Sequence, residues 1–137
     1  PLAATTHHRY EPGQRYEPHF DYGEACDFEE NEANGPRHVT MLIYLNDLPE
    51  ADGGHTVFPR LDLKVSPRAH AAVVFNDCHA DGGEDARTLH GGTPPLSNAA
   101  KAAINVWIRA GGFRRGRAAT SAWRGALQAQ LEATTGG

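Results

Sequence analysis

The sequence of 137 residues lacks the features that most quickly assign a protein to a class. No apolar run approaches the ~20 residues of a membrane-spanning helix, and no secretory signal is visible. The two cysteines, Cys26 and Cys78, have no C-x-x-C spacing, which argues against a zinc knuckle or a thioredoxin-like site. One disulfide in an oxidising lumen and two free thiols both remain compatible with the sequence. Internal repeats and low-complexity tracts are absent.

A large excess of charge is also lacking, since the net charge is only -4. Acidic residues gather in residues 21–34 and arginines in residues 109–124, and we interpret both runs as solvated surface. No basic patch with interleaved aromatics is present, so we predict no nucleic-acid partner and no membrane span in this chain. The compartment is unknown: an endoplasmic reticulum lumen suits a eukaryotic chain and the cytoplasm a bacterial one. The chain begins at Pro1 without a Met, which leaves open whether an N-terminal region is missing.

What is present is the pattern of a soluble, mainly β protein with one core. Hydrophobic residues make up 39% of the chain and charged residues 22%, as in ordinary globular domains. Short runs rich in β-branched and aromatic residues alternate with turn signals, which predicts a sandwich or barrel. The expected strands are residues 7–10, 16–21, 38–45, 56–58, 71–75 and 101–109.

Other segments are predicted to be irregular or helical. Residues 24–36 and 80–87 read as long loops, and we expect the first to be a lid over an extended peptide. Trp123, Leu127 and Leu131 recur every four residues, which predicts an amphipathic helix over residues 120–133. We therefore expect one domain in residues 1–110 and a linker with a C-terminal helical tail in residues 111–137.

A possible metal site is the most informative feature. His19 and Asp21 stand two residues apart in a predicted strand, so that both side chains would share one face, and His90 lies far downstream. Two imidazoles and one carboxylate form the facial triad of non-haem Fe(II) oxygenases, which leaves positions open for a co-substrate and O2. Lys101, eleven residues after His90 on the predicted inward face of the last strand, could bind the distal carboxylate of 2-oxoglutarate.

Five segments carry motifs of one known family. They are Tyr10-Glu-Pro-Gly-Gln-Arg-Tyr-Glu-Pro-His-Phe-Asp-Tyr22, Arg37-His-Val-Thr-Met-Leu-Ile-Tyr-Leu-Asn46, Gly53-Gly-His-Thr-Val-Phe-Pro59, Leu89-His-Gly-Gly92, and Lys101 through Trp107-Ile108. In order and spacing they resemble the prolyl 4-hydroxylase catalytic domain. The resemblance extends over roughly residues 10–109 and implies a double-stranded β-helix, a jelly-roll barrel like that of cupins.

The resemblance also implies roles for individual residues. His19, Asp21 and His90 match the iron ligands, and Lys101 matches the residue that binds the 2-oxoglutarate tail. Together these four are the expected catalytic set. Tyr10, Thr40 and Trp107 match positions near the co-substrate, and Tyr16, Arg37 and Trp107 match positions near the iron and the peptide groove.

The implied activity is hydroxylation of prolyl residues in peptides or proteins, with Fe(II), 2-oxoglutarate and O2, ascorbate as reductant, and release of succinate and CO2. Asp21 favours hydroxylation over halogenation, because related halogenases lack that carboxylate. The chain departs from the family pattern at His55, where an acid is usual, and at His70, where a turn glycine is usual. The same chemistry on a free amino acid or small molecule, and a non-catalytic peptide-binding jelly roll, stay open. A cupin-type isomerase or a zinc hydrolase fits the motifs less well.

Overall fold

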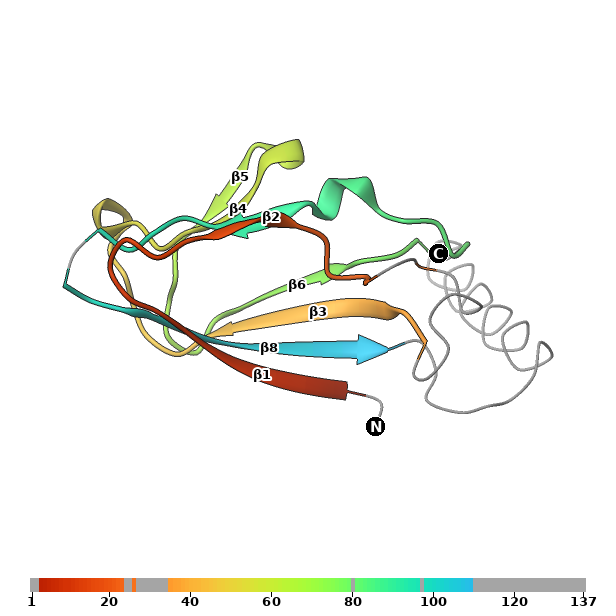
Figure 1. Ribbon diagram of the computed structural model, residues 1–137, viewed down its shortest axis with the longest axis horizontal. Helices are drawn as coiled ribbons and strands as arrows, with labels where there is room; N and C mark the ends of the chain where they lie inside the picture. The colour runs from red at the N-terminus through yellow and green to blue at the C-terminus, as the bar shows by residue number, and fades with distance from the viewer. Residues whose placement is uncertain (1–2, 24–25, 27–34, 80, 97, 110–137) are drawn as a thin grey trace, which may run out of the picture.

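A computed structural model of the protein describes residues 3–23, 26, 35–79, 81–96 and 98–109. Two four-stranded antiparallel sheets form two layers (Figure 1). The first sheet has the order β1-β8-β3-β6 and the second the order β2-β7-β4-β5. The predicted jelly-roll architecture is confirmed. The strands are β1 (Ala3–Tyr10), β2 (Tyr16–His19), β3 (Arg37–Tyr44), β4 (Thr56–Phe58), β5 (Leu63–Val65), β6 (Ala72–Asn76), β7 (His90–Gly92) and β8 (Lys101–Arg109).

The strand predictions are accurate where the sequence signal is strong. The bounds of β8 and β4 agree with the prediction, and those of β3 and β6 differ by one residue at each end. The prediction for β2 was wrong at its end, because the strand stops at His19 and Asp21 lies in a bend beyond it. Its partner β7 has only three residues, and their pairing ends at His19 opposite His90.

Three short 3-10 helices and two short strands were not predicted. The helices are η1 (Glu50–Asp52), η2 (Pro59–Leu61) and η3 (Ala86–Thr88). Strand β5 is mostly exposed and carries little apolar pattern, while β7 contains two glycines, which have low strand propensity. Gly91 is required there, because a Cβ on it would lie 2.9 Å from the carbonyl O of Tyr16 in the neighbouring strand.

The space between the sheets is filled by aromatic residues on one side of the site. The ring of Phe75 lies 5.2 Å from that of Phe58 and 4.8 Å from that of His90, measured between centroids. Tyr44 and Ala103, which are cross-strand partners in the first sheet, are also buried. His90 is thus held within the packed interior, where its ring has little freedom to rotate.

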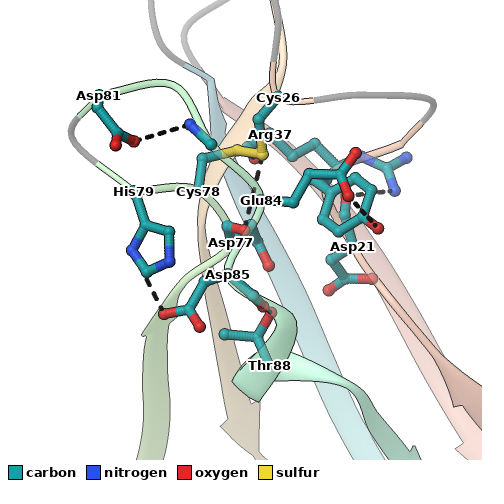
Figure 2. Close-up of a disulfide and its surroundings, with 12 residues drawn as sticks. Asp21, Cys26, Arg37, Asp77, Cys78, His79, Asp81, Glu84, Asp85 and Thr88 are labelled. Atoms are coloured by element: carbon teal, nitrogen blue, oxygen red, sulfur yellow. Dashed lines mark hydrogen bonds and ion pairs between the residues drawn. A yellow bond between two sulfur atoms is a disulfide. The ribbon is translucent and has the colours of Figure 1, made fainter.

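Cys26 and Cys78 form a disulfide, which settles the question that the sequence left open (Figure 2). Both residues are buried. Sγ of Cys26 lies 3.7 Å from the carbonyl O of Asp77, and Sγ of Cys78 lies 3.5 Å from that of Arg37. The bond therefore ties Cys26, in the segment between β2 and β3, to the chain just after β6, where Cys78 lies beside the beginning of β3.

Several predictions concern residues outside the described part of the chain. The linker and helix expected in residues 111–137 lie there entirely, as does most of the expected lid in residues 24–36. Of the second predicted loop, residues 81–87 are described, and the last two of them already belong to η3. Among the described residues, no helix has the length and apolar character needed to cross a membrane.

Candidate active site

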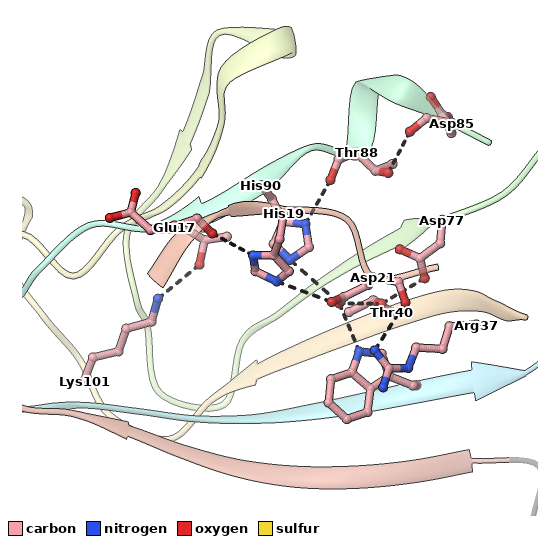
Figure 3. Close-up of polar contacts among 12 residues, drawn as sticks. Glu17, His19, Asp21, Arg37, Thr40, Asp77, Asp85, Thr88, His90 and Lys101 are labelled. Atoms are coloured by element: carbon pink, nitrogen blue, oxygen red, sulfur yellow. Dashed lines mark hydrogen bonds and ion pairs between the residues drawn. The ribbon is translucent and has the colours of Figure 1, made fainter. Parts of the chain in front are cut away.

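Strand pairing brings the three candidate metal ligands together. His19 and His90 are directly opposite each other in the β2–β7 ladder, and Asp21 follows β2 by two residues. One potential ligand atom from each residue lies within 4.8 Å of the others (Figure 3). Asp21 and His90 are buried, while His19 is partly exposed. The cluster is accessible from one side and enclosed on the other.

The two imidazoles are oriented by carbonyl groups of the chain. Nδ1 of His19 lies 2.8 Å from the carbonyl O of Glu17, and Nδ1 of His90 lies 2.9 Å from that of Thr88. A carbonyl oxygen only accepts, so each Nδ1 carries a proton and each neutral ring presents a lone pair at Nε2. These Nε2 atoms lie 3.4 and 3.7 Å from the carboxylate oxygens of Asp21. Two lone pairs and an anion at such distances favour a positive charge between them, which a proton or a metal ion can supply.

Asp21 is held as a carboxylate by donors from the first sheet. Thr40 and Trp107 are cross-strand partners in β3 and β8, and both donate to Oδ2 of Asp21, at 2.9 and 3.0 Å. Burial acts to raise the pKa of Asp21, but its contacts with His19, Trp107 and Thr40 and the charge of His90 lower it to about 2. The carboxylate is therefore ionised at neutral pH.

The two imidazoles differ in their tendency to take a proton. Burial lowers the pKa of His90. Burial also acts to lower the pKa of His19, but the hydrogen bonds with Asp21 and with the Glu17 carbonyl outweigh it, and the pKa of His19 is raised. Protonation of the cluster on acidification therefore begins at His19, the more exposed of the two rings.

A cavity extends from the histidines toward Lys101. Its wall combines aromatic and aliphatic surface with hydroxyl, imidazole and amide groups. Two of its polar atoms, Nε2 of His8 and Oδ1 of Asn105, are buried and have no hydrogen-bond partner in the part of the chain that the structure describes. Such atoms indicate a space that a polar ligand completes. The lining residues are His8, Tyr10, Tyr16, His19, Thr40, Leu42, Thr56, His90, Gly91, Gly92, Lys101 and Asn105.

Lys101 is a buried cation at the inner end of this cavity. Its side chain is only 3% exposed, and Nζ donates to Oγ1 of Thr56 at 3.2 Å. Among the described residues, no carboxylate forms an ion pair with it. Burial lowers the pKa of Lys101 to about 8. A buried ammonium with only a neutral hydroxyl as acceptor is unfavourable, and an anionic group in the cavity would relieve it.

Comparison with known proteins assigns the fold and the site to a family. The model of the family described as the 2OG-Fe(II) oxygenase superfamily matches residues 5–109. The chain belongs to this superfamily. The matched region begins within β1 and ends at the last residue of β8, so it includes both sheets and the whole cavity.

Individual relatives of this oxygenase domain are prolyl 4-hydroxylases. Probable prolyl 4-hydroxylase 3 of Arabidopsis thaliana is 34% identical and aligns with 77% of this chain and 42% of its own length. Prolyl 4-hydroxylase 1 of the same plant is 36% identical and aligns with 74% of this chain and 38% of its own length. A putative prolyl 4-hydroxylase of Acanthamoeba polyphaga mimivirus is also 36% identical and aligns with 74% of this chain and 42% of its own length. The chain spans about two fifths of the length of these relatives.

Solved structures show the same architecture. The viral collagen prolyl hydroxylase of Paramecium Bursaria Chlorella virus-1, in its 2OG complex, matches with a TM-score of 0.66 and 32% identity. The match covers 80% of this chain and 61% of the viral one. A prolyl-4-hydroxylase of Pseudomonas putida matches at 24% identity with a TM-score of 0.56, which supports the fold alone.

The residues of this oxygenase domain fit both groups in the family's name. Two neutral imidazoles and one carboxylate are a donor set suited to Fe(II), and nothing on the cavity side of the cluster supplies a further protein ligand among the described residues. Lys101 is a buried cation with no carboxylate partner among the described residues, which suits it to bind the distal carboxylate of a dicarboxylate. Two polar atoms in the lining of the cavity between them, Nε2 of His8 and Oδ1 of Asn105, have no partner among the described residues.

The other residues singled out from the sequence fall into two groups. Tyr10, Tyr16 and Thr40 line the cavity. Arg37 and Trp107 are not among its lining residues; they stack on each other, with the guanidinium carbon 4.1 Å from the ring centroid. Both donate to Asp21: Trp107 donates to the carboxylate of Asp21, and Arg37 donates to the backbone carbonyl O of Asp21 at 3.4 Å.

Sequence reasoning missed four polar residues near the site. Thr56 accepts hydrogen bonds from Lys101 and from the hydroxyl of Tyr44. Asn105 shares the face of Lys101 and Trp107, so strand alternation could have identified it. His8 could have been found in the same way from Tyr10. Asp77 follows β6 directly and gives no periodic signal.

Proposed function

We propose that the chain is the catalytic domain of an Fe(II)- and 2-oxoglutarate-dependent dioxygenase that hydroxylates prolyl residues in peptides or proteins, releasing succinate and CO2. The observation that carries this proposal is the cavity that joins the His19, Asp21 and His90 cluster to the buried Lys101. The relatives named as prolyl 4-hydroxylases support the prolyl substrate. The proposed domain comprises residues 1–110, with residues 111–137 as a linker and tail.

In this proposal, His19, Asp21 and His90 hold the iron and Lys101 binds the distal carboxylate of 2-oxoglutarate. Iron bound there supplies the activation of O2 that couples oxidative decarboxylation of 2-oxoglutarate to oxygen insertion into a C–H bond. Ascorbate serves as the reductant that keeps iron in the Fe(II) state. Tyr10 and Thr40 line the co-substrate space that Lys101 closes at its inner end.

The peptide would approach from the more open side of the cluster. Tyr16 is 49% exposed and its ring lies edge-on to that of His19, with 4.2 Å between centroids. An exposed aromatic ring beside the candidate metal ligand is suited to stack on a proline ring. We assign Tyr16 to substrate contact, and Arg37 and Trp107 to the adjoining part of the peptide groove.

Succinate formation tests the proposed activity. The protein is incubated under air with Fe(II), ascorbate and 2-oxoglutarate, with and without a proline-rich peptide. We expect peptide-stimulated succinate and a peptide that has gained one oxygen atom. Succinate formation that is equal with and without the peptide would refute the prolyl substrate and leave a free amino acid or small molecule as the acceptor. Metal binding without any succinate would indicate a non-catalytic jelly roll.

Alanine variants test the residue roles. We expect His19→Ala, Asp21→Ala and His90→Ala each to abolish turnover, because each removes one of three metal ligands. His79→Ala is the matched control, since His79 lies on the loop after β6 and is largely exposed. Turnover at the wild-type rate in any of the three ligand variants would refute the assignment.

A further inference from the structure

A second buried acid lies behind the candidate metal site. Asp77 directly follows β6 and is 0% exposed. Oγ1 of Thr40 lies 2.9 Å from Oδ2 of Asp77 and 2.9 Å from Oδ2 of Asp21. The three side chains therefore form a row from Asp77 through Thr40 to Asp21 (Figure 3). Asp21 is 3% exposed and Thr40 1%, so water has little access to either contact.

The number of protons in this row determines the charge of Asp77. A threonine hydroxyl carries one proton and can donate to only one of the two carboxyl groups. The other contact is then favourable only if that carboxyl donates its own proton to a lone pair of the hydroxyl. One of the two acids is therefore neutral.

Asp21 is the ionised member of the pair. It accepts a hydrogen bond from Trp107, which stabilises a negative charge, and it lies beside both imidazoles, with which it would share the metal ion. Asp77 has no comparable donors among the described residues: its Oδ1 is buried and has no hydrogen-bond partner there. A carbonyl oxygen of a neutral acid tolerates that isolation far better than a carboxylate oxygen does. Burial first, and the charge of Asp21 in addition, raise the pKa of Asp77 to about 7.

We propose that Asp77 is a positioning residue of the metal site, a neutral carboxylic acid that donates to Thr40 so that the Thr40 hydroxyl donates to Oδ2 of Asp21. Oδ2 then receives two hydrogen bonds, from Thr40 and Trp107, and Oδ1 is left for the metal. A carboxylate held in this way binds a metal through one oxygen and keeps the remaining coordination positions open. This inference rests on the proposed function, in which Asp21 is a metal ligand.

The backbone around Asp77 is anchored on two sides. Its N–H donates to the carbonyl O of His38 at 2.9 Å, and its carbonyl O accepts from the N–H of Asp85 at 3.1 Å. Cys78, the next residue, is bonded to Cys26. Asp77 therefore cannot withdraw easily from Thr40, as a positioning role requires.

Infrared difference spectroscopy tests the protonation state without any metal. At about pH 6, we expect the wild-type protein to show the C=O stretching band of a buried protonated carboxylic acid and Asp77→Asn to lack it. Asp85→Asn is the matched control, because Asp85 is ionised through its 2.6 Å ion pair with Arg87 and its loss should leave the band in place. Absence of the band from the wild-type protein would overturn the inference.

Metal affinity tests the positioning role, with Mn(II) as an air-stable probe and calorimetry as the readout. The amide of Asp77→Asn can donate to Thr40 as the acid does, so its Kd should stay close to that of the wild-type protein. Asp77→Ala and Thr40→Val interrupt the row and should raise the Kd about 10- to 100-fold. Thr40→Val is nearly isosteric and remains informative if Asp77→Ala folds poorly.

The outcomes separate this inference from the proposed function. If the wild-type protein binds Mn(II) but Asp77→Asn is weakened as much as Asp77→Ala, Asp77 acts as a carboxylate and the inference is wrong. Unchanged affinity in Thr40→Val and Asp77→Ala would show that the row does not position Asp21. A wild-type protein that binds no Mn(II) would overturn the proposed metal site itself, and the positioning role with it.

Discussion

Lys101 should destabilise the protein in the absence of 2-oxoglutarate. Burial lowers its pKa from the ordinary value of 10.5 to about 8, which at about 1.4 kcal/mol per pH unit corresponds to ~3 kcal/mol. Below pH 8, Lys101 is charged in both the folded and the unfolded chain, and the full cost of burying the charge is present. Between about pH 8 and 10.5, the unfolded chain binds more protons than the folded one, so this cost is relieved as the pH rises.

Lys101→Met removes the charge and retains a long apolar side chain. We expect the variant to be about 3 kcal/mol more stable than the wild-type protein at pH 7, a rise in Tm on the order of 10 °C. The difference should shrink steadily above pH 8, because only the wild-type protein gains stability there. Urea unfolding of both proteins at a series of pH values from 7 to 10 measures it.

The control is Lys64→Met, which removes an exposed lysine paired with Glu50 and should change the pH dependence of stability very little. A Lys101→Met variant that is less stable than the wild-type protein at pH 7, or a difference that does not vary with pH, would refute this account of a costly buried cation.

The same substitution should have the opposite effect on ligand binding. A hydrogen bond to a charged group contributes about 1.5–3 kcal/mol, so Lys101→Met should weaken 2-oxoglutarate binding on the order of 10- to 150-fold. With Mn(II) present, 2-oxoglutarate should raise the Tm of the wild-type protein and raise that of the variant much less. Equal shifts would show that another group binds the distal carboxylate.

Three further substitutions test other parts of the structure. Serine at both Cys26 and Cys78 opens a loop with a sequence separation of 52 and should lower the free energy of unfolding by about 4 kcal/mol, measured in urea; a loss below ~1 kcal/mol would contradict this. His70 has a φ of 67°, so His70→Gly should raise stability by up to about 1 kcal/mol, and a lower Tm would count against backbone strain there. Trp107→Phe removes a donor to Asp21 and should raise the Kd for Mn(II) about 10- to 100-fold by calorimetry, whereas an unchanged Kd would exclude that role.

The sequence predicts those parts of the fold that depend on local pattern. Alternation in residues 101–109 places Lys101, Asn105 and Trp107 on one face, and the structure has β8 over the same residues. Strand β7 could not be predicted in this way, because two of its three residues are glycines whose suitability depends on the close approach of β2. The bend that carries Asp21 likewise follows from the short length of β7 and not from its own sequence.

The candidate site follows the same division. The residue types of His19, Asp21 and His90 indicate a metal site, and the order and spacing of the motifs around them indicate the protein family. Their geometry depends on long-range register, since His19 meets His90 through the β2–β7 ladder. Asp77 is 56 residues from Asp21 in the chain, and only the folded structure reveals that one hydroxyl links them.

The site is divided between the two sheets, and this division ties it to the closure of the sandwich. The second sheet supplies the histidines, and the first supplies Thr40 and Trp107, which hold the carboxylate of Asp21. A slip of one residue between β3 and β8 would turn one of these donors away, because side chains alternate between faces. The donors therefore meet Asp21 only when the first sheet is in register and the second is packed against it. A metal ion bound to His19, Asp21 and His90 would in turn favour that closed arrangement over any in which the sheets separate.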